Sequence, residues 1–146
     1  MVDPARLARL LDVMAVELDV LASLATRDDG DLRADVTAIR AVKYAFVVAI
    51  EVAIDAAEHV IASEGLRVPE SFSDAFAVLD EAGVLDDELA EAMAQAARFR
   101  NLLVHGYADV DDDRVLHILR TRPDDLRAYR AVIAGLARGE DPPAVG

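Results

Sequence analysis

The strongest constraint on the fold is a run of apolar residues between Asp31 and about Ser63 that recurs every three to four positions. Spacing of this kind places the apolar side chains on one wide face of an α-helix. A helix so long and so apolar is expected to be the central member of a bundle, or to face a partner subunit as well. The repeat comprises Ile39, Val42, Phe46, Val47, Ile50, Ala53, Ile54, Ala57, Val60 and Ile61.

Further helical segments lie on both sides of this one. Residues suited to capping helix N-termini, together with Gly and Pro, separate them. No stretch indicates a β-strand. The sequence therefore predicts an all-α protein, an antiparallel bundle of about five helices, in one domain at residues 1–138 with a loose tail at 139–146. The expected segments run from Pro4 to about residue 26, from Ser71 to Gly83, from Leu85 to His105, and from Asp112 to Leu136 with a break at Pro123.

Several classes of chemistry are excluded by residues that are missing. The chain has no cysteine, so it holds no disulfide, no thiolate zinc site and no Cys nucleophile. The Glu-x-x-His pairs of a di-iron bundle are absent, as are His-Glu-x-x-His, a Walker loop and Gly-x-Gly-x-x-Gly. We expect no metal and no cofactor, and we expect His59 to be a hydrogen-bonded polar-face residue rather than a ligand.

The cellular location follows from similar arguments. No apolar segment approaches the roughly 20 residues that span a bilayer. The N-terminus lacks the pattern of a secretion signal. We expect a cytoplasmic protein that does not enter a membrane.

The charge of the chain is distributed unevenly. The net charge of −13 argues against nucleic acid for the molecule as a whole, because phosphate binding requires clustered Lys and Arg. Residues 1–97 carry seven basic and 20 acidic side chains, whereas residues 98–138 carry eight arginines and six aspartates. This is either an ordinary solvated surface or a basic face that handles an anion on an acidic molecule.

Chemically capable side chains are densest in the segment Arg-Asn-Leu-Leu-Val-His-Gly-Tyr at residues 100–107. The planar guanidinium of Arg100 is always charged and can donate two parallel hydrogen bonds to a phosphate. His105 can act as acid or base near neutral pH. The pair suffices for metal-free RNA cleavage to a 2′,3′-cyclic phosphate, with His105 moving the 2′-OH or leaving-group proton and Arg100 stabilising the phosphorane.

Helix geometry weakens this interpretation. Arg100 and His105 lie about 140° apart on an unbroken helix, whereas Arg98, Asn101 and His105 share one face. Spacing alone favours a structural helix end over an active site. Gly106 stands where a helix-ending glycine belongs and frees His105 from ideal helical geometry, and a second subunit could complete a site.

The segment also resembles a known family, the HepT-like toxins of the HEPN superfamily (the DUF86 group). The pattern Arg-x(4–6)-His is matched by Arg100 and His105, and the fuller Arg-Asn-x-x-x-His-x-Tyr also by Asn101 and Tyr107. The runs at 49–59, 71–76 and 83–90 are similar to the group as well. The resemblance extends from Ala41 to about Ala137.

The resemblance implies an endoribonuclease toxin of a type VII toxin–antitoxin module, with Arg100 and His105 catalytic and Asn101 supporting them. Arg98 and Arg114 are candidate RNA contacts. The implied assembly is a homodimer whose two copies form one composite cleft.

The implied partner of this toxin is an antitoxin, a nucleotidyltransferase of the MNT type. It would transfer AMP from ATP to Tyr107, and the added charge and bulk beside the motif would block the RNA backbone. Two other functions remain open: a non-catalytic HEPN-like module that binds a nucleotide or pairs with a nucleotidyltransferase, and a plain helical dimerisation subunit.

Overall fold

The computed structural model describes residues 1–140, which form seven α-helices and one 3-10 turn without any β-strand. The predicted all-α fold is confirmed. Of the tail that was expected to be loose, residues 141–146 lie outside the described residues. The helices are α1 (Pro4–Leu24), α2 (Asp29–Ala34), α3 (Val36–Ser63), α4 (Phe72–Glu81), α5 (Asp87–His105), α6 (Asp112–Thr121) and α7 (Pro123–Ala137), and the 3-10 turn η1 is Tyr107–Asp109.

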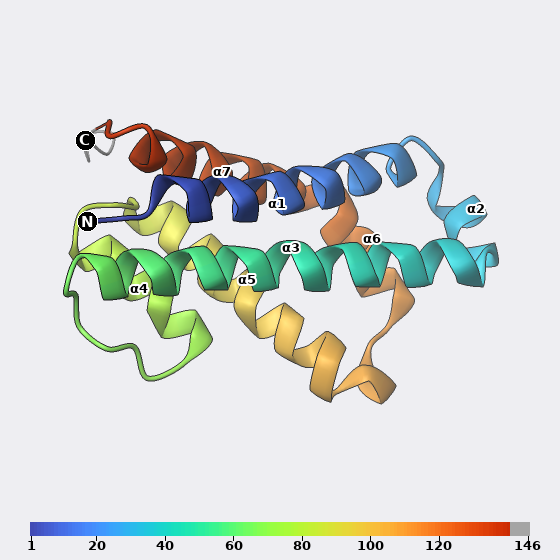
Figure 1. The fold of residues 1–146 in the computed structure, drawn as a ribbon. Helices are drawn as coiled ribbons and strands as arrows, with labels where there is room; N and C mark the ends of the chain where they lie inside the picture. The colour runs from blue at the N-terminus through green and yellow to red at the C-terminus, as the bar shows by residue number, and fades with distance from the viewer. Residues whose placement is uncertain (141–146) are drawn as a thin grey trace.

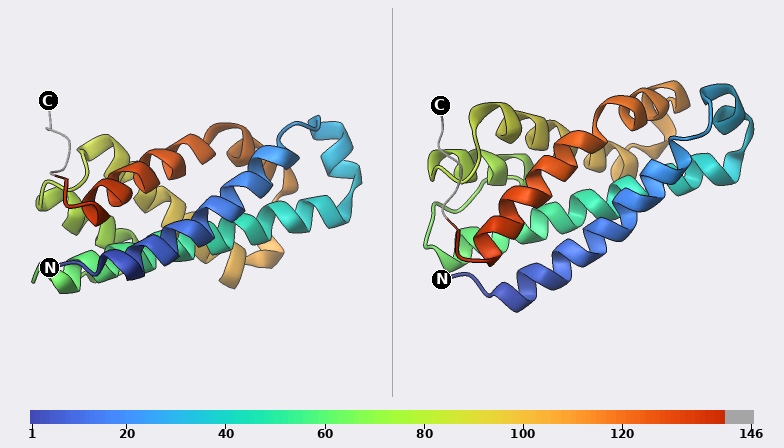
Figure 2. Two further views of the ribbon diagram at one scale, coloured as in Figure 1. Left: turned by 45° about the horizontal axis from the view of Figure 1, so that its top comes forward. Right: turned by 90° about the horizontal axis from the view of Figure 1, so that it is seen from above.

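The four longest helices, α1, α3, α5 and α7, form an antiparallel bundle (Figures 1 and 2). Helix α3 contacts α1, α4, α5 and α7, while α4 packs along α5. The short helices α2 and α6 contact each other and α3 at the end of the bundle where α1 connects to α3. The C-terminal part of α5 diverges from α3, so its last turns and η1 project to one side (Figure 1).

Acidic side chains begin most of the helices. Each one accepts a hydrogen bond from a backbone N–H of the first turn, which satisfies a donor that has no partner inside the helix. The Ala38 N–H and Arg27 hold the pKa of the Asp35 carboxyl below its usual value. Five of the 28 acidic side chains of the chain therefore serve as helix caps. The capping residues are Asp3, Asp28, Asp35, Ser71, Asp86 and Asp111.

The central helix begins at Val36, not near Asp31 as the apolar repeat predicted. Residues Asp29–Ala34 form the separate helix α2, and Asp35 is extended at φ −110° and ψ 96° while it caps α3. The spacing of apolar residues does not reveal this break, because Leu32 on α2 is fully buried in the same core as the apolar residues of α3. The chain also breaks at Arg122, between α6 and α7. Residues 1–140 therefore form seven α-helices rather than the predicted five or so.

The buried core of the bundle contains two aromatic pairs. Tyr129 is fully buried, and its hydroxyl donates to the Ala53 carbonyl oxygen at 2.7 Å. The ring of Tyr129 packs edge-on against Phe76 with centroids 5.5 Å apart, and Phe46 packs in the same way against Phe99 at 5.6 Å. Burial raises the pKa of Tyr129.

Several predicted details of the helix ends are confirmed. Gly65 and Gly83, with φ of 63° and 77°, follow the ends of α3 and α4. The predicted polar role of His59 is also confirmed, because its Nε2 accepts the Asp3 N–H at 2.9 Å. This bond joins the start of α1 to the end of α3.

Candidate active site

Helix α5 carries the Arg-Asn-x-x-x-His segment without interruption, and His105 is its last residue. The Gly106 N–H donates to the Leu102 carbonyl oxygen at 2.8 Å. Gly106 directly follows the last residue of α5, as predicted for a helix-ending glycine, and its φ is −115°. A Cβ at this position would lie only 2.9 Å from Leu102 Cδ1. The Leu102 carbonyl oxygen lies 3.3 Å from the same position, so a larger residue here would require a small shift of Leu102.

The guanidinium of Arg100 is held on three sides. Its Nε and Nη2 donate to Glu51 Oε1 at 3.2 and 2.7 Å, and its Nη1 donates to Asn101 Oδ1 at 3.1 Å. The guanidinium carbon lies 5.4 Å from the centroid of the Phe72 ring, within the range of a cation–π contact. The side chain is only 14 % exposed. Arg100 is therefore a fixed cation at the edge of the core.

Glu51 is the residue of this site that the sequence analysis missed. It lies on α3 and is 43 % exposed. One signal was available, because Glu51 is the single charged residue between Lys43 and Asp55 in the most apolar helix. Burial first, and then the neighbouring Glu51, raise the pKa of Asp55, one turn further along α3. Glu51 is thus the acidic residue of this helix that contacts Arg100.

His105 and Tyr107 lie beyond Arg100 and are open to solvent. His105 ends α5, and Tyr107 begins η1 with 76 % of its surface exposed. The structure brings Asn101 to Arg100 but does not bring His105 there. Because α5 is continuous through both positions, Arg100 and His105 leave the helix about 140° apart. The idea that Gly106 frees His105 from helical geometry is not supported within one chain.

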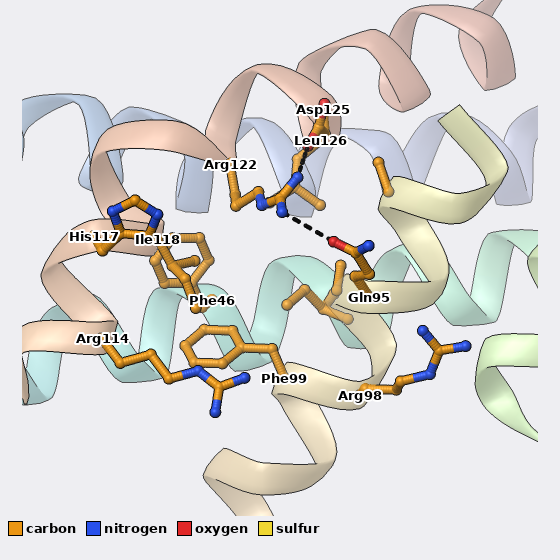
Figure 3. Close-up of a pocket in the computed structure, with 13 residues that line it drawn as sticks. Phe46, Gln95, Arg98, Phe99, Arg114, His117, Ile118, Arg122, Asp125 and Leu126 are labelled. Atoms are coloured by element: carbon orange, nitrogen blue, oxygen red, sulfur yellow. Dashed lines mark hydrogen bonds and ion pairs between the residues drawn. The ribbon is translucent and has the colours of Figure 1, made fainter. Parts of the chain in front are cut away.

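The two candidate RNA contacts, Arg98 and Arg114, line a single pocket of about 300 Å³ between α5, α6 and α7 (Figure 3). His117 lines it as well, and so does Arg122, which the sequence did not point to. Arg122 donates to Gln95 Oε1 at 2.9 Å and lies 3.4 Å from Asp125. Arg100 does not line this pocket, so Arg98 and Arg100, two residues apart on α5, have different surroundings.

A second pocket of about 250 Å³ lies between α4 and α5 and has the opposite character. Asp74, Asp80, Asp87 and Glu91 line it, and Arg98 stands at the border between the two pockets. A hydrogen bond with Asp87, followed by burial, raises the pKa of Asp80. These carboxylates disfavour a phosphate group inside this pocket.

Neither a membrane-spanning helix nor a metal-binding cluster is found in residues 1–140. No helix within residues 1–140 combines the length and apolarity needed to cross a bilayer. The same residues contain no group of three or more His, Asp or Glu side chains placed to share a metal ion.

The fold of the chain is that of solved HEPN toxins. One similar structure is a tri-AMPylated HEPN toxin from Shewanella oneidensis in complex with an MNT antitoxin, with a TM-score of 0.82 and 22 % identity, covering 91 % of this chain and 98 % of that one. Another is YutE, a cytosolic protein of unknown function from Bacillus subtilis, with a TM-score of 0.82 and 18 % identity, covering 98 % and 96 % of the two chains.

The model of the family "Ribonuclease HepT-like" matches residues 14–133, and the chain belongs to this family. The mRNA nuclease HepT of Shewanella oneidensis is 28 % identical over 83 residues, 57 % of this chain and 62 % of that protein. A candidate RNase of Archaeoglobus fulgidus is 36 % identical over 78 residues, 53 % of this chain and 58 % of that protein. The matches thus span less than two thirds of the length of both relatives.

Proposed function

We propose that this chain is an endoribonuclease toxin in which Arg100 and His105 are the catalytic residues. The observation that carries the proposal is the state of Arg100, a guanidinium only 14 % exposed and oriented by Glu51 and Asn101, inside the segment that matches the ribonuclease family. A preorganised cation of this kind stabilises charge that develops on a phosphorane. His105, exposed at the end of the same helix, supplies the titratable group.

The proposed reaction is an internal transfer at one phosphodiester. A neutral imidazole of His105 takes the proton of the 2′-OH, and the 2′-oxygen attacks phosphorus. Arg100 stabilises the charge on the non-bridging oxygens. The bond to the 5′-oxygen breaks, and an imidazolium returns a proton to that oxygen. The products are a 2′,3′-cyclic phosphate and a 5′-hydroxyl, and no metal takes part.

We propose that a homodimer brings together Arg100 and His105, which lie apart within a single chain. Beside the Arg100–Glu51 pair, α3 presents Tyr44 at 67 % exposure and α4 presents Phe72 at 40 %. The partly buried Val47 and Val48 lie on α3 between Tyr44 and Glu51, so apolar surface continues along this face. Burying this face against a second copy would bring two Arg-x(4)-His segments to one cleft.

A cleavage assay with the purified chain tests the activity. We expect single-stranded RNA to be cut at an undiminished rate in excess EDTA, because the proposed proton transfers need only His105 and Arg100. Mass spectrometry of the fragments should find 2′,3′-cyclic phosphate ends. Loss of cleavage in EDTA with recovery on adding a divalent ion would contradict the metal-free mechanism, and 3′-hydroxyl ends would contradict the 2′-OH attack.

We further propose that a nucleotidyltransferase antitoxin switches the enzyme off at Tyr107. The Tyr107 hydroxyl would attack the α-phosphorus of ATP, lose its proton and release pyrophosphate. The exposure of this side chain on η1 leaves it open to a second active site, and its place two residues after His105 puts the added phosphate beside the catalytic groups.

Intact mass tests this regulation. Protein produced together with a nucleotidyltransferase antitoxin of the MNT type is expected to gain one or more AMP increments and to lose RNase activity. Tyr107→Phe should remain unmodified and active in the presence of the partner. Tyr44→Phe is the matched control, because Tyr44 is the other exposed tyrosine, and it should be modified as the wild type is. Increments that persist in Tyr107→Phe would assign the modification elsewhere.

One observation favours the second candidate function, a non-catalytic module that binds a nucleotide or a nucleotidyltransferase. The carboxylate of Glu51 already occupies two donors of Arg100, and His105 lies on another side of the helix. Such a module would bind its partner and leave RNA intact in the assay above. The two candidates therefore differ in one measurement.

A further inference from the structure

The pocket between α5, α6 and α7 has an apolar floor. Phe46, Phe99 and Leu126 reach its base and are almost completely buried. Ala92 and Ala96, one turn apart on α5, leave the space above them open. The volume of about 300 Å³ lies at the lower end of the range for small-molecule sites. The pocket therefore has room for one flat apolar group.

The rim of the pocket is cationic, although the whole chain carries a net charge of −13. Arg114 has no ion-pair or hydrogen-bond partner within residues 1–140, and the contact of Arg98 with Glu91 is long, at 3.6 Å, and exposed. Two guanidinium groups thus remain available to a ligand, beside a third that Gln95 orients. The rim is formed by Arg98, Arg114, His117 and Arg122, together with the carboxylate of Asp125, which lies 3.4 Å from Arg122 (Figure 3).

We propose that this pocket binds one nucleotide, with its base on the apolar floor and its phosphate among the arginines of the rim. An apolar floor suits the flat face of an unstacked base, and guanidinium forks suit phosphate oxygens. The inference rests on the proposed function, because the nucleotide is taken to be one unit of the single-stranded RNA substrate. It adds a binding subsite away from Arg100.

The exposed face of α5 connects this subsite with the proposed reaction. Arg98 and His105 are seven residues apart, so they lie on nearly the same face of the helix and about 10 Å apart along its axis. An RNA strand anchored at Arg98 therefore runs a short distance along α5 to reach His105. The pocket holds a nucleotide near the cleaved bond and not the cleaved bond itself.

Binding of a fluorescent single-stranded RNA with 2′-O-methyl groups tests the subsite, because this probe binds without being cut. We expect Arg114→Gln to weaken binding about tenfold and to reduce the slope of log Kd against log salt by about 1. Ala96→Phe fills the pocket and should weaken binding by a similar factor without changing the slope. Arg127→Gln, which removes the same charge on α7 outside the pocket, should bind as the wild type does.

Competition with free adenosine monophosphate separates the two sources of a nucleotide. Displacement of the probe in the wild type but not in Arg114→Gln would extend the assignment to mononucleotides. Resistance to competition would restrict it to RNA strands.

Wild-type affinity in both Arg114→Gln and Arg98→Gln would overturn the proposal, and these exposed substitutions remove the objection that the variant is unfolded. An effect of Arg114→Gln on binding of the nucleotidyltransferase alone would also overturn it, since the rim would then be a protein-docking surface. Failure of the ribonuclease proposal looks different: the probe binds in a pocket-dependent manner, but the wild type does not cut unmodified RNA.

Discussion

Replacing Arg100 or His105 with alanine is expected to lower the rate of RNA cleavage at least about 100-fold while leaving the fold intact. His105 is exposed at a helix end, so its removal creates no cavity. Removal of Arg100 leaves Glu51, which is 43 % exposed and therefore stays hydrated. Single-turnover cleavage rates with circular dichroism check both points, and each variant should also relieve growth inhibition.

Two further variants serve as controls for the loss of RNA cleavage. Arg100→Lys keeps the charge but loses the fork that spans Glu51 and Asn101, so we expect activity between those of the wild type and Arg100→Ala. Arg127→Ala, far along the chain on α7, should cleave normally. Full activity and full toxicity in both Arg100→Ala and His105→Ala would contradict the assignment of the catalytic residues.

Mixing the two inactive variants tests the composite cleft. If Arg100 of one chain works with His105 of the other, mixed dimers contain one complete site and recover part of the activity, whereas each variant alone stays inactive. No recovery would place the working Arg100 and His105 in the same chain. The angle between these side chains on α5 favours recovery.

The second large effect concerns stability. Phe76→Ala is expected to lower the free energy of unfolding by about 3–5 kcal/mol, because the ring is completely buried and its removal loses both transfer free energy and packing around the cavity. The lost ring also leaves Tyr129 without its edge-on partner. Urea unfolding followed by circular dichroism measures the change.

Tyr129→Phe provides the matched comparison for this prediction. It keeps the ring and removes only the hydroxyl that bonds to Ala53, so the expected loss is about 1 kcal/mol. The order of the two variants is the informative result. An equal loss in both would mean that the buried hydrogen bond, rather than aromatic packing, dominates this part of the core.

Local chemistry explains why much of the helical fold could be predicted from the sequence. Asp86 and Ser71 cap helices through bonds to the next few residues, and these signals are contained within one turn. The break at Asp35 escaped detection because α2 and α3 both point apolar residues into one core. A single extended residue between them leaves the apolar spacing almost unchanged.

The candidate site was less predictable because its contacts are distant along the chain. Arg100 is oriented by Glu51, 49 residues earlier, and no local pattern pairs them. The rim of the α5–α6–α7 pocket likewise depends on how α6 and α7 pack. The motif indicated which residues of α5 to consider. Helix geometry predicted that the side chains of Arg100 and His105 leave the helix in different directions, and α5 is indeed continuous through both.

The three tyrosines of the chain differ in a way that gives the molecule an internal optical reporter. There is no tryptophan, so near-ultraviolet absorption and emission come mainly from phenols. Tyr129 is buried with a raised pKa, while Tyr44 and Tyr107 face solvent. Esterification of Tyr107 would remove the phenolic proton of one of the two tyrosines that are exposed in a single subunit. An alkaline difference spectrum of the folded protein could therefore follow the proposed modification without any label.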